Sequence, residues 1–401
     1  MNPQLDKLQP YPFEKTRSLL ADLTPPRDLA PISFAIGEPR DPAPAFALDV
    51  LRDNLDKVSQ YPSTRGLESL RAVICEWLAR RFAVPRTALD PDCHVLPVNG
   101  TREALFSFTQ AIIDTTDAPV VVMPNPFYQI YEGAALLAGA EPYFINCDAA
   151  NDFVPDFDAV PAAVWRRCQL LFICTPGNPT GSVLDLETLK KLIMLADEHD
   201  FVIASDECYS EIYPDENNPP PGLLQACAAL GRDDFHRCMV FHSLSKRSNL
   251  PGLRSGFVAG DAHIMARYFS YRTYHGCAMP VQHQLASIAA WDDEIHVRES
   301  RQRYRRKFEA VLDILAPVLD VGMPAAGFYL WPRTPVPDTE FTRQLLARQH
   351  VRVVPGTYLA RGTAAGNPGA HRVRMALVAE LEQCIEGAQR IRGFLEAGTT
   401  K

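Results

Sequence analysis

Positions 240–254 of the sequence read VFHSLSKRSNLPGLR, and this stretch decides which fold we expect. An apolar, strand-like segment enters a polar turn there, with Lys246 three residues after Ser243 and eight before Arg254. Lysine is scarce, with eight among 40 basic residues, and a charged lysine at the end of a buried strand is costly. A neutral amine, or a Schiff base with a carbonyl cofactor, removes that cost, and the serines and arginine nearby could bind a phosphate. Taken alone, the stretch also fits a surface lysine in a polar loop.

The composition is that of a globular protein. The 401 residues are enough for two domains, and 47% are hydrophobic and 22% charged. Because the net charge is −8 and no long basic run occurs, we expect neither nucleic acid nor membrane as a partner. The first residues do not resemble a signal peptide, and no apolar run approaches about 18 residues. The ten cysteines are scattered without zinc-type spacing, so we expect no bound metal. We also expect the thiols to be reduced, as in a cytoplasmic protein.

The spacing of apolar residues divides the chain into three parts. Residues 1–45 are irregular and rich in proline, as expected of an N-terminal arm that joins part of a small domain. From 46 to 290, short apolar strands alternate with helical segments such as Leu186–His199, which predicts a mostly parallel sheet between two layers of helices. From 291 to 401, a long charged helix from Trp291 to about Leu315 leads into a smaller α+β domain. The strands expected in the large domain are Pro119–Met123, Leu170–Cys174, Phe201–Glu207, Met239–Leu244 and Gly256–Gly260.

Polar residues follow several of these strands. Gly100 allows a tight turn before a helix, whose first N–H groups can receive a phosphate. Asn178 is held between prolines and glycines, and its amide can donate to an oxyanion. Asp206 ends a buried strand and could pair with a protonated ring nitrogen, while Tyr209 could donate to a phenolic oxygen. Each of these residues also has a simpler interpretation. The turn at Gly100 fits an ordinary helix cap, Asn178 fits a tight turn, and Asp206 fits an aspartate that caps a helix.

Two further features are ambiguous when taken alone. Tyr128 lies in an aromatic loop after a strand, where it could stack on a flat cofactor or simply belong to the core. Arg372 and Arg374 alternate on one strand of the small domain, where an arginine suits either a substrate carboxylate or a surface salt bridge.

Together these motifs resemble the fold-type I aminotransferases of class I and II, which use pyridoxal 5′-phosphate. The resemblance covers nearly the whole chain, and five motif positions match at once: Asn178, Asp206, Tyr209, Lys246 and Arg254. It implies a large domain with a mostly parallel seven-stranded sheet sandwiched by helices, and a smaller α+β domain. One departure is Thr175-Pro176, where the family usually has Asn-Pro, and it leaves Asn178 in place.

The resemblance also implies roles for the cofactor-binding residues. Lys246 would form the Schiff base and then carry the proton, and Asp206 would keep the pyridine nitrogen protonated. Asn178 and Tyr209 would hydrogen-bond the ring's phenolic oxygen, and Tyr128 would stack on the ring. The phosphate would be held by Gly100, Thr101, Arg102, Ser243, Ser245 and Arg254.

For the substrate and the assembly, the same resemblance gives four expectations. Arg374, not Arg372, would grip the α-carboxylate, and the backbone of Gly37 would line the substrate site beside Asn178. Tyr61 would reach the phosphate in a partner subunit, which implies a homodimer with shared active sites. The segment Tyr271–Met279 is expected to cross the same interface.

Within the family, three segments look like the bacterial succinyldiaminopimelate transaminases of lysine biosynthesis: Val98–Phe106, Tyr271–Met279 and Ala290–Val297. The expected substrates are glutamate and N-succinyl-2-amino-6-oxopimelate, with Arg40 and Arg272 as candidates for binding the distal carboxylates. The alternatives are another transaminase of the class, acting on alanine, aspartate or aromatic amino acids, and a carbon–sulfur β-lyase. A transcription regulator with this fold would need an added basic domain, and a Rossmann dehydrogenase would need Gly-x-Gly-x-x-Gly after a strand.

Overall fold

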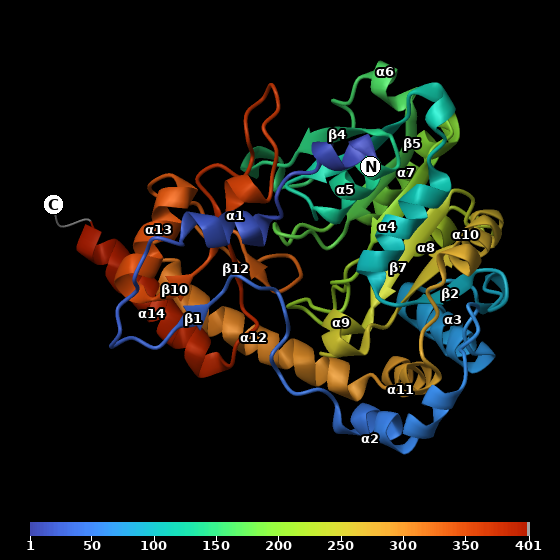
Figure 1. Cartoon of the computed structure of the whole chain (residues 1–401), viewed down its shortest axis with the longest axis horizontal. Helices are drawn as coiled ribbons and strands as arrows, with labels where there is room; N and C mark the ends of the chain where they lie inside the picture. Colours follow the sequence, from blue (N-terminus) through green and yellow to red (C-terminus); the bar gives the residue numbers. More distant parts are fainter. Residues whose placement is uncertain (399–401) are drawn as a thin grey trace.

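The computed structural model describes residues 1–398, and its centre is a seven-stranded sheet in the order β2-β8-β7-β6-β5-β3-β4 (Figure 1). β8 is antiparallel to both of its neighbours, and every other adjacent pair is parallel. This arrangement confirms the mostly parallel, seven-stranded sheet. The strands are β2 (Val95–Val98), β3 (Val120–Asn125), β4 (Glu141–Asn146), β5 (Cys168–Cys174), β6 (Val202–Asp206), β7 (Cys238–Ser243) and β8 (Gly256–Gly260).

Helices cover both faces of this sheet because successive strand residues point to opposite sides. In β3, Val120 and Val122 belong to one hydrophobic core, whereas Val121 and Met123 belong to another. The first core includes residues of α3 (Glu68–Phe82), α7 (Leu186–His199), α8 (Leu223–Ala229) and α11 (Val281–Asp292). The second includes residues of α4 (Thr101–Ile112), α5 (Ile130–Leu137) and α10 (Ala262–His275).

The sequence predicted five of these strands to within two residues and missed β2 and β4. β2 has four residues and contains Pro97, and β4 is a partly exposed edge strand that contains Pro142. Proline removes a ladder hydrogen bond and is tolerated mainly at sheet edges, so both segments lack the usual strand signal.

The second domain gathers short strands and three long helices. β11 (Val354–Pro355), β12 (Val373–Ala376) and β9 (Tyr329–Leu330) form a three-stranded antiparallel sheet. β1 (Ile32–Ser33) pairs in parallel with β10 (Val351–Arg352), so this N-terminal strand joins C-terminal elements. The long helices are α12 (Ile295–Leu315), α13 (Asp338–Gln349) and α14 (Leu381–Gly398).

Two expectations about helices were wrong. The single helix expected from Trp291 is two helices, because α11 ends at Asp292 and α12 begins at Ile295. Between them, the carboxylate of Asp293 accepts from the backbone N–H of His296, the second residue of α12, at 2.9 Å. The arm before residue 45 is also not wholly irregular, because it contains a 3₁₀ turn (Pro3–Lys7) and α1 (Pro12–Leu19).

The remaining elements are short. α2 (Ala45–Asp53), α6 (Ala162–Trp165) and α9 (Leu244–Arg247) complete the α-helices of residues 1–398. The other 3₁₀ turns there are Leu55–Ser59, Arg86–Ala88, Thr115–Asp117, Ala149–Asn151, Pro251–Leu253 and Gly356–Tyr358. None of the described helices is long and apolar enough to cross a membrane.

The N-terminal segment links the two domains. Its first 3₁₀ turn contacts α5 on the large sheet, whereas α1 contacts β11 in the small domain. Figure 1 shows this segment running from the large sheet across to α1 beside β12. Residues 8–12 therefore cross the space between the two domains.

Candidate active site

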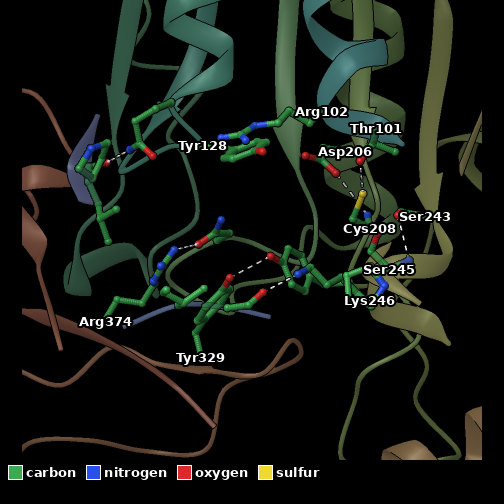
Figure 2. Close-up of a pocket in the computed structure, with 18 of the residues that line it drawn as sticks. Thr101, Arg102, Tyr128, Asp206, Cys208, Ser243, Ser245, Lys246, Tyr329 and Arg374 are labelled. Carbon is green, nitrogen blue, oxygen red and sulfur yellow. Dashed lines mark hydrogen bonds between the residues drawn. The ribbon is translucent and has the colours of Figure 1, made fainter. Parts of the chain in front are cut away.

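A cavity of about 400 Å³ lies at the carboxyl ends of the central strands and is closed from the other side by the small domain (Figure 2). This is the edge at which open α/β sheets bind ligands. Twelve residues singled out from the sequence line it: Gly37, Thr101, Arg102, Tyr128, Asn178, Asp206, Tyr209, Ser243, Ser245, Lys246, Arg254 and Arg374.

Lys246 lies in α9, the single helical turn that follows β7 directly. Its Nζ donates to the backbone oxygen of Gly37 at 2.5 Å. Burial, assisted by the charges of Arg374 and Arg254, lowers the pKa of Lys246 to about 8. A usable fraction of the amine is therefore neutral near neutral pH, as a nucleophilic lysine requires.

Asp206 ends β6 at the floor of the cavity and is 4% exposed. Its Oδ2 accepts from the hydroxyl of Tyr131 at 2.7 Å, and its Oδ1 accepts from the backbone N–H of Cys208 at 3.3 Å. Burial raises the pKa of the Asp206 carboxyl, and these donors oppose the rise. A buried carboxylate held by neutral donors is suited to a protonated ring nitrogen in a ligand.

Asn178 and Tyr209 lie at the ends of β5 and β6 and are held by residues of the small domain. The Arg374 guanidinium donates to Oδ1 of Asn178 at 3.1 Å, which leaves the Asn178 amide N–H groups for a ligand. The hydroxyls of Tyr209 and Tyr329 are 3.0 Å apart, and Tyr329 belongs to β9. Both polar groups therefore depend on contacts between the two domains.

Arg374 is 4% exposed, and its second guanidinium nitrogen donates to the backbone oxygen of Ala35 at 2.8 Å. Its Nε is buried without a hydrogen-bond partner among the residues that the structure describes. Arg372 points elsewhere, because it donates to the backbone oxygen of Trp331 at 2.8 Å and does not line the cavity. Arg372 lies just before β12, outside the strand, so its side chain does not follow that of Arg374, and only Arg374 of the pair lines the cavity.

The opposite end of the cavity can hold an anion. α4 begins at Thr101 without a side-chain cap, so its first N–H groups are free to bind a negative charge. Ser243 and Ser245 lie beside this helix start, with the N–H of Ser245 donating to Oγ of Ser243 at 3.1 Å. Gly100 has φ of +86°, and a Cβ there would lie 2.1 Å from a guanidinium nitrogen of Arg254. The glycine thus lets the arginine lie against the turn.

Tyr128 lines the cavity edge-on to Tyr131, with ring centroids 5.8 Å apart. The Arg102 side chain extends beside the Tyr128 ring, away from Ser243 and Ser245 (Figure 2). Its Nη2 donates to the hydroxyl of Tyr11 at 2.8 Å. The expected place of Arg102 in a phosphate site therefore fits its backbone at the helix start better than its guanidinium.

Three candidates lie away from this cavity. Tyr61 is completely exposed, and Arg40 is exposed as well. Arg272 is fully buried in α10, where it pairs with Glu103 at 2.5 Å. Arg272 is thus not available to a ligand in this cavity, and the hypothesis that it binds a distal carboxylate there is wrong.

Several residues that line or support the cavity were not singled out from the sequence, among them Tyr11, Phe13, Tyr131, Cys208 and Tyr329. Tyr131 is the second residue of α5 and lies three residues after Tyr128, and an aromatic residue so close to a candidate in sequence was a usable signal. Tyr11 and Phe13 come from a segment with no motif, and only the fold brings them here.

Among residues 1–398, one group of metal-binding residue types occurs, and it lies outside the cavity. Glu103, His275 and Cys277 place their ligand atoms within 4.8 Å of one another. The guanidinium of Arg272 already donates to Glu103, so this carboxylate has a cationic partner. The expectation that the protein binds no metal stays a prediction.

Comparisons with known proteins agree with this geometry. The family "Aminotransferase class I and II" matches residues 30–391. A relative named LL-diaminopimelate aminotransferase, from Nitratidesulfovibrio vulgaris strain Miyazaki F, is 32% identical over 395 residues, which is 97% of each chain. The crystal structure of an aminotransferase from Neisseria meningitidis Z2491 is 48% identical, has a TM-score of 0.94, and covers 98% of this chain and 100% of its own. A structure from Thermus thermophilus named "probable N-succinyldiaminopimelate aminotransferase" is 28% identical, with a TM-score of 0.83 and coverage of 96% and 99%.

Proposed function

Because this chain belongs to the class I and II aminotransferases, enzymes that use pyridoxal 5′-phosphate, we propose that it exchanges an amino group between glutamate and N-succinyl-2-amino-6-oxopimelate. The reaction would serve diaminopimelate and lysine biosynthesis. The substrates of the class are amino acids and 2-oxo acids. The choice of the succinylated substrate rests on the segments Val98–Phe106, Tyr271–Met279 and Ala290–Val297, and on the named Thermus thermophilus structure.

One observation carries the assignment of the reaction centre. Lys246, whose pKa is lowered to about 8, and the buried carboxylate of Asp206 line one cavity. A neutral amine and a carboxylate without a cationic side chain fit a cofactor that has both a carbonyl and a basic ring nitrogen. The free N–H groups at the start of α4, together with Ser243 and Arg254, fit its phosphate.

Bound pyridoxal phosphate supplies a carbonyl that condenses with amines and a ring that withdraws electrons from the substrate's α-carbon. Lys246, as a neutral amine, takes the proton from that α-carbon. Asp206 would hold a proton on the ring nitrogen by its negative charge, and the hydrogen bond from Tyr131 helps to keep Asp206 ionised. The amide of Asn178 and the hydroxyl of Tyr209, which line the cavity, would donate to the ring's oxygen.

Substrate positioning falls to the small domain and the N-terminal segment. Arg374 offers a guanidinium fork to the α-carboxylate, and its contact with Asn178 couples substrate binding to cofactor binding. The backbone of Gly37 lies against the Lys246 amine, so this loop sets how close a substrate comes to the base. Tyr329 closes the cavity above Tyr209.

A second candidate substrate is LL-diaminopimelate without the succinyl group. It is favoured by the Nitratidesulfovibrio vulgaris relative, whose name gives that substrate and which matches over 97% of both chains. Both candidate substrates carry an α-carboxylate that Arg374 would bind, and they differ in the group at the other end of the molecule. Transamination of alanine, aspartate or aromatic amino acids, and β-elimination at a carbon–sulfur bond, remain the other outcomes of the test.

The assembly we propose is a homodimer in which Tyr61 reaches the phosphate site of the partner subunit. The proposal is supported by the complete exposure of Tyr61 and by two apolar side chains close to it in sequence, Leu55 and Val58, which are 55% and 69% exposed. Tyr274, in the other segment expected at the interface, is 92% exposed. A partner subunit would cover these aromatic and aliphatic side chains.

The ten free cysteines fit a reducing compartment, and we place the enzyme in the cytoplasm.

The deciding experiment is a donor screen with the cofactor-loaded enzyme and 2-oxoglutarate. The donors are N-succinyl-LL-diaminopimelate, LL-diaminopimelate, alanine, aspartate and tyrosine, and glutamate formation is followed. The succinylated donor should have the highest kcat/KM. A tenfold preference for any other donor would overturn the substrate proposal, and pyruvate release from cystathionine without glutamate formation would identify a lyase.

A further inference from the structure

The hydroxyl groups of Tyr209 and Tyr329 form a pair that the proposed mechanism uses only in part. Their oxygens are 3.0 Å apart, and both side chains line the cavity. Tyr209 follows β6 in the large domain, whereas Tyr329 belongs to β9 in the small domain. Among residues 1–398, neither hydroxyl makes another hydrogen bond. The pair therefore holds two protons and uses only one of them internally.

The direction of this hydrogen bond decides what Tyr209 can do. A phenol has one proton, so a Tyr209 hydroxyl that donates to Tyr329 has none left for a ligand. If Tyr329 donates instead, its proton is used within the pair and the Tyr209 proton stays available. The role proposed for Tyr209, as a donor to the ring oxygen of the cofactor, therefore needs Tyr329 as the donor inside the pair.

The surroundings of Tyr329 hold its hydroxyl in one place. Its ring packs against that of Phe328, with centroids 4.7 Å apart. Its oxygen lies so close to Gly37 that a Cβ added there would be 2.1 Å away, so this side of the hydroxyl is closed to a ligand. Figure 2 shows Tyr329 between Arg374 and Lys246. The hydroxyl is thus fixed at the boundary between the two domains, within reach of Tyr209.

The charge of Arg374 favours Tyr329 as the donor. The guanidinium carbon lies 4.7 Å from the centroid of the Tyr329 ring. Burial raises the pKa of Tyr329, and the charge of Arg374 is the strongest effect against that rise. Burial also raises the pKa of Tyr209, and there the neighbouring Tyr329 adds to the rise. Tyr329 is therefore the more acidic phenol of the two, and the more acidic phenol is the better donor.

We propose that Tyr329 is a positioning residue, whose hydroxyl donates to the oxygen of Tyr209 and so directs the Tyr209 proton to the ring oxygen of bound pyridoxal phosphate. The proposal rests on the role of Tyr209 in the proposed function. Because the two tyrosines come from different domains, the hydrogen bond forms only where the domains meet as they do in this structure. The small domain thus acts on the cofactor ring as well as on the substrate.

The test is a visible-light titration of the cofactor-loaded enzyme without substrate. The measured quantity is the pH midpoint at which bound pyridoxal phosphate changes colour. A donor to the ring oxygen stabilises the form in which that oxygen is negatively charged, so loss of the donor raises the midpoint. Tyr209→Phe should raise it by about one to two pH units, as for a hydrogen bond to a charged group. Tyr329→Phe should raise it by about 0.4–1 unit, as for a hydrogen bond between neutral groups.

A double variant separates positioning from packing. If Tyr329 acts through Tyr209, adding Tyr329→Phe to Tyr209→Phe should leave the midpoint where Tyr209→Phe alone puts it. The matched control is Tyr304→Phe. Tyr304 is 1% exposed in the same hydrophobic cluster, and its hydroxyl has no hydrogen-bond partner in the described part of the chain. This control should keep the midpoint of the parent enzyme.

Gly37→Ala provides a second variant that keeps both phenols. Its Cβ would push the Tyr329 hydroxyl away, so the midpoint should rise, and it should not rise further when Tyr209→Phe is also present. This variant decides the question if Tyr329→Phe does not fold or does not take up the cofactor.

The outcomes distinguish the inference from the proposed function. No shift in Tyr329→Phe, or a shift that adds fully to that of Tyr209→Phe, would overturn the inference and leave the proposed function intact. No shift in Tyr209→Phe would remove the role proposed for Tyr209, and the inference with it. Because no substrate is present, neither result depends on which amino acid the enzyme converts.

Discussion

The hydroxyl of Tyr131 donates to Oδ2 of Asp206 over 2.7 Å, and both side chains are almost completely buried. Tyr131 is held in place by its stack on Phe172, with ring centroids 4.4 Å apart and planes 12° apart. Burial would favour a protonated Asp206, and this phenol is one of the groups that oppose it. A tyrosine outside the recognised motif thus supports the charge on which the ring chemistry depends.

Tyr131→Phe should move the acid limb of the kcat/KM profile to higher pH. Without the donor, the pKa of Asp206 rises further, so its ionised form is lost earlier as pH falls. A hydrogen bond to a charged group contributes about 1.5–3 kcal/mol, which corresponds to a shift of about one to two pH units. Tyr268→Phe is the control, since it removes an equally buried hydroxyl that bonds Ser107 instead. Identical acid limbs in the two variants would show that Tyr131 does not act through Asp206.

Attachment of pyridoxal phosphate to the apoenzyme should occur at Lys246 and should follow its lowered pKa. The rate should rise about tenfold per pH unit and level off above about pH 8, because the neutral amine is the reacting form. Borohydride reduction and peptide mapping should locate the adduct on Lys246. Lys246→Ala should retain phosphate-dependent binding and lose about 10²–10⁴-fold in proton transfer. An adduct on Lys190 or Lys191 would refute the assignment.

Asp206→Asn should stabilise the cofactor-free protein while impairing transamination. Burial raises the folded-state pKa of Asp206, so its ionisation destabilises the folded protein at pH values above that pKa. The gain in the free energy of unfolding should be small at pH 4, near the unfolded-state pKa, and larger at pH 8, because the destabilisation grows above the unfolded-state pKa and levels off above the folded-state pKa. It should be about 1.4 kcal/mol for each unit by which folding raises the pKa. Urea unfolding at both pH values tests this. Equal stability of variant and parent at pH 8, or near-normal turnover, would contradict the role.

Gly100→Ala should weaken cofactor binding beyond the cost of its backbone conformation. An added Cβ would lie 2.1 Å from Arg254, and the φ of +86° disfavours any side chain. Gly366→Ala has a similar φ of +93° with open space around it, so it reports the backbone cost alone. Both variants should lose about 1–2 kcal/mol of stability. A clear rise in the pyridoxal phosphate dissociation constant is expected only for Gly100→Ala, and similar constants for both would argue against the contact with Arg254.

A mixed dimer of Tyr61→Phe and Lys246→Ala chains should contain one site with normal cofactor affinity. If Tyr61 acts across the interface, one site receives both substitutions and the other receives neither. The Tyr61→Phe homodimer should bind pyridoxal phosphate about ten- to a hundred-fold more weakly, as for loss of a charge-assisted hydrogen bond. Cofactor titration of the mixed dimer measures the recovery. No recovery, or full activity in a monomer at high dilution, would place Tyr61 outside the partner's site.

The sequence predicted backbone features well where several local signals coincide. β8 begins and ends at the same residues as the apolar run Gly256–Gly260, and the lysine turn follows β7 directly. Asp206 and Asn178 reach the cavity because the carboxyl ends of parallel strands meet at one edge of the sheet. These placements need only the strand pattern and the direction of the chain.

Side-chain orientation could not be predicted in the same way. Arg102 and Arg272 are both arginines near motif segments, yet one turns into the cavity and the other into a buried pair with Glu103. The partner of Arg102 is Tyr11, 91 residues away in sequence, and Arg272 meets a residue 169 positions away. Such pairs depend on how the domains and the N-terminal segment pack, which no local pattern encodes.

The N-terminal segment that crosses between the domains has a practical consequence for protein engineering. Tyr11 and Phe13 form part of the cavity wall, although they stand near the start of the chain, where purification tags are attached and proteases commonly cut. A chain that begins at residue 20 would keep the seven-stranded sheet, Lys246 and Asp206. It would nevertheless lack Tyr11, which accepts a hydrogen bond from Arg102, and Phe13, so part of the cavity wall would be missing.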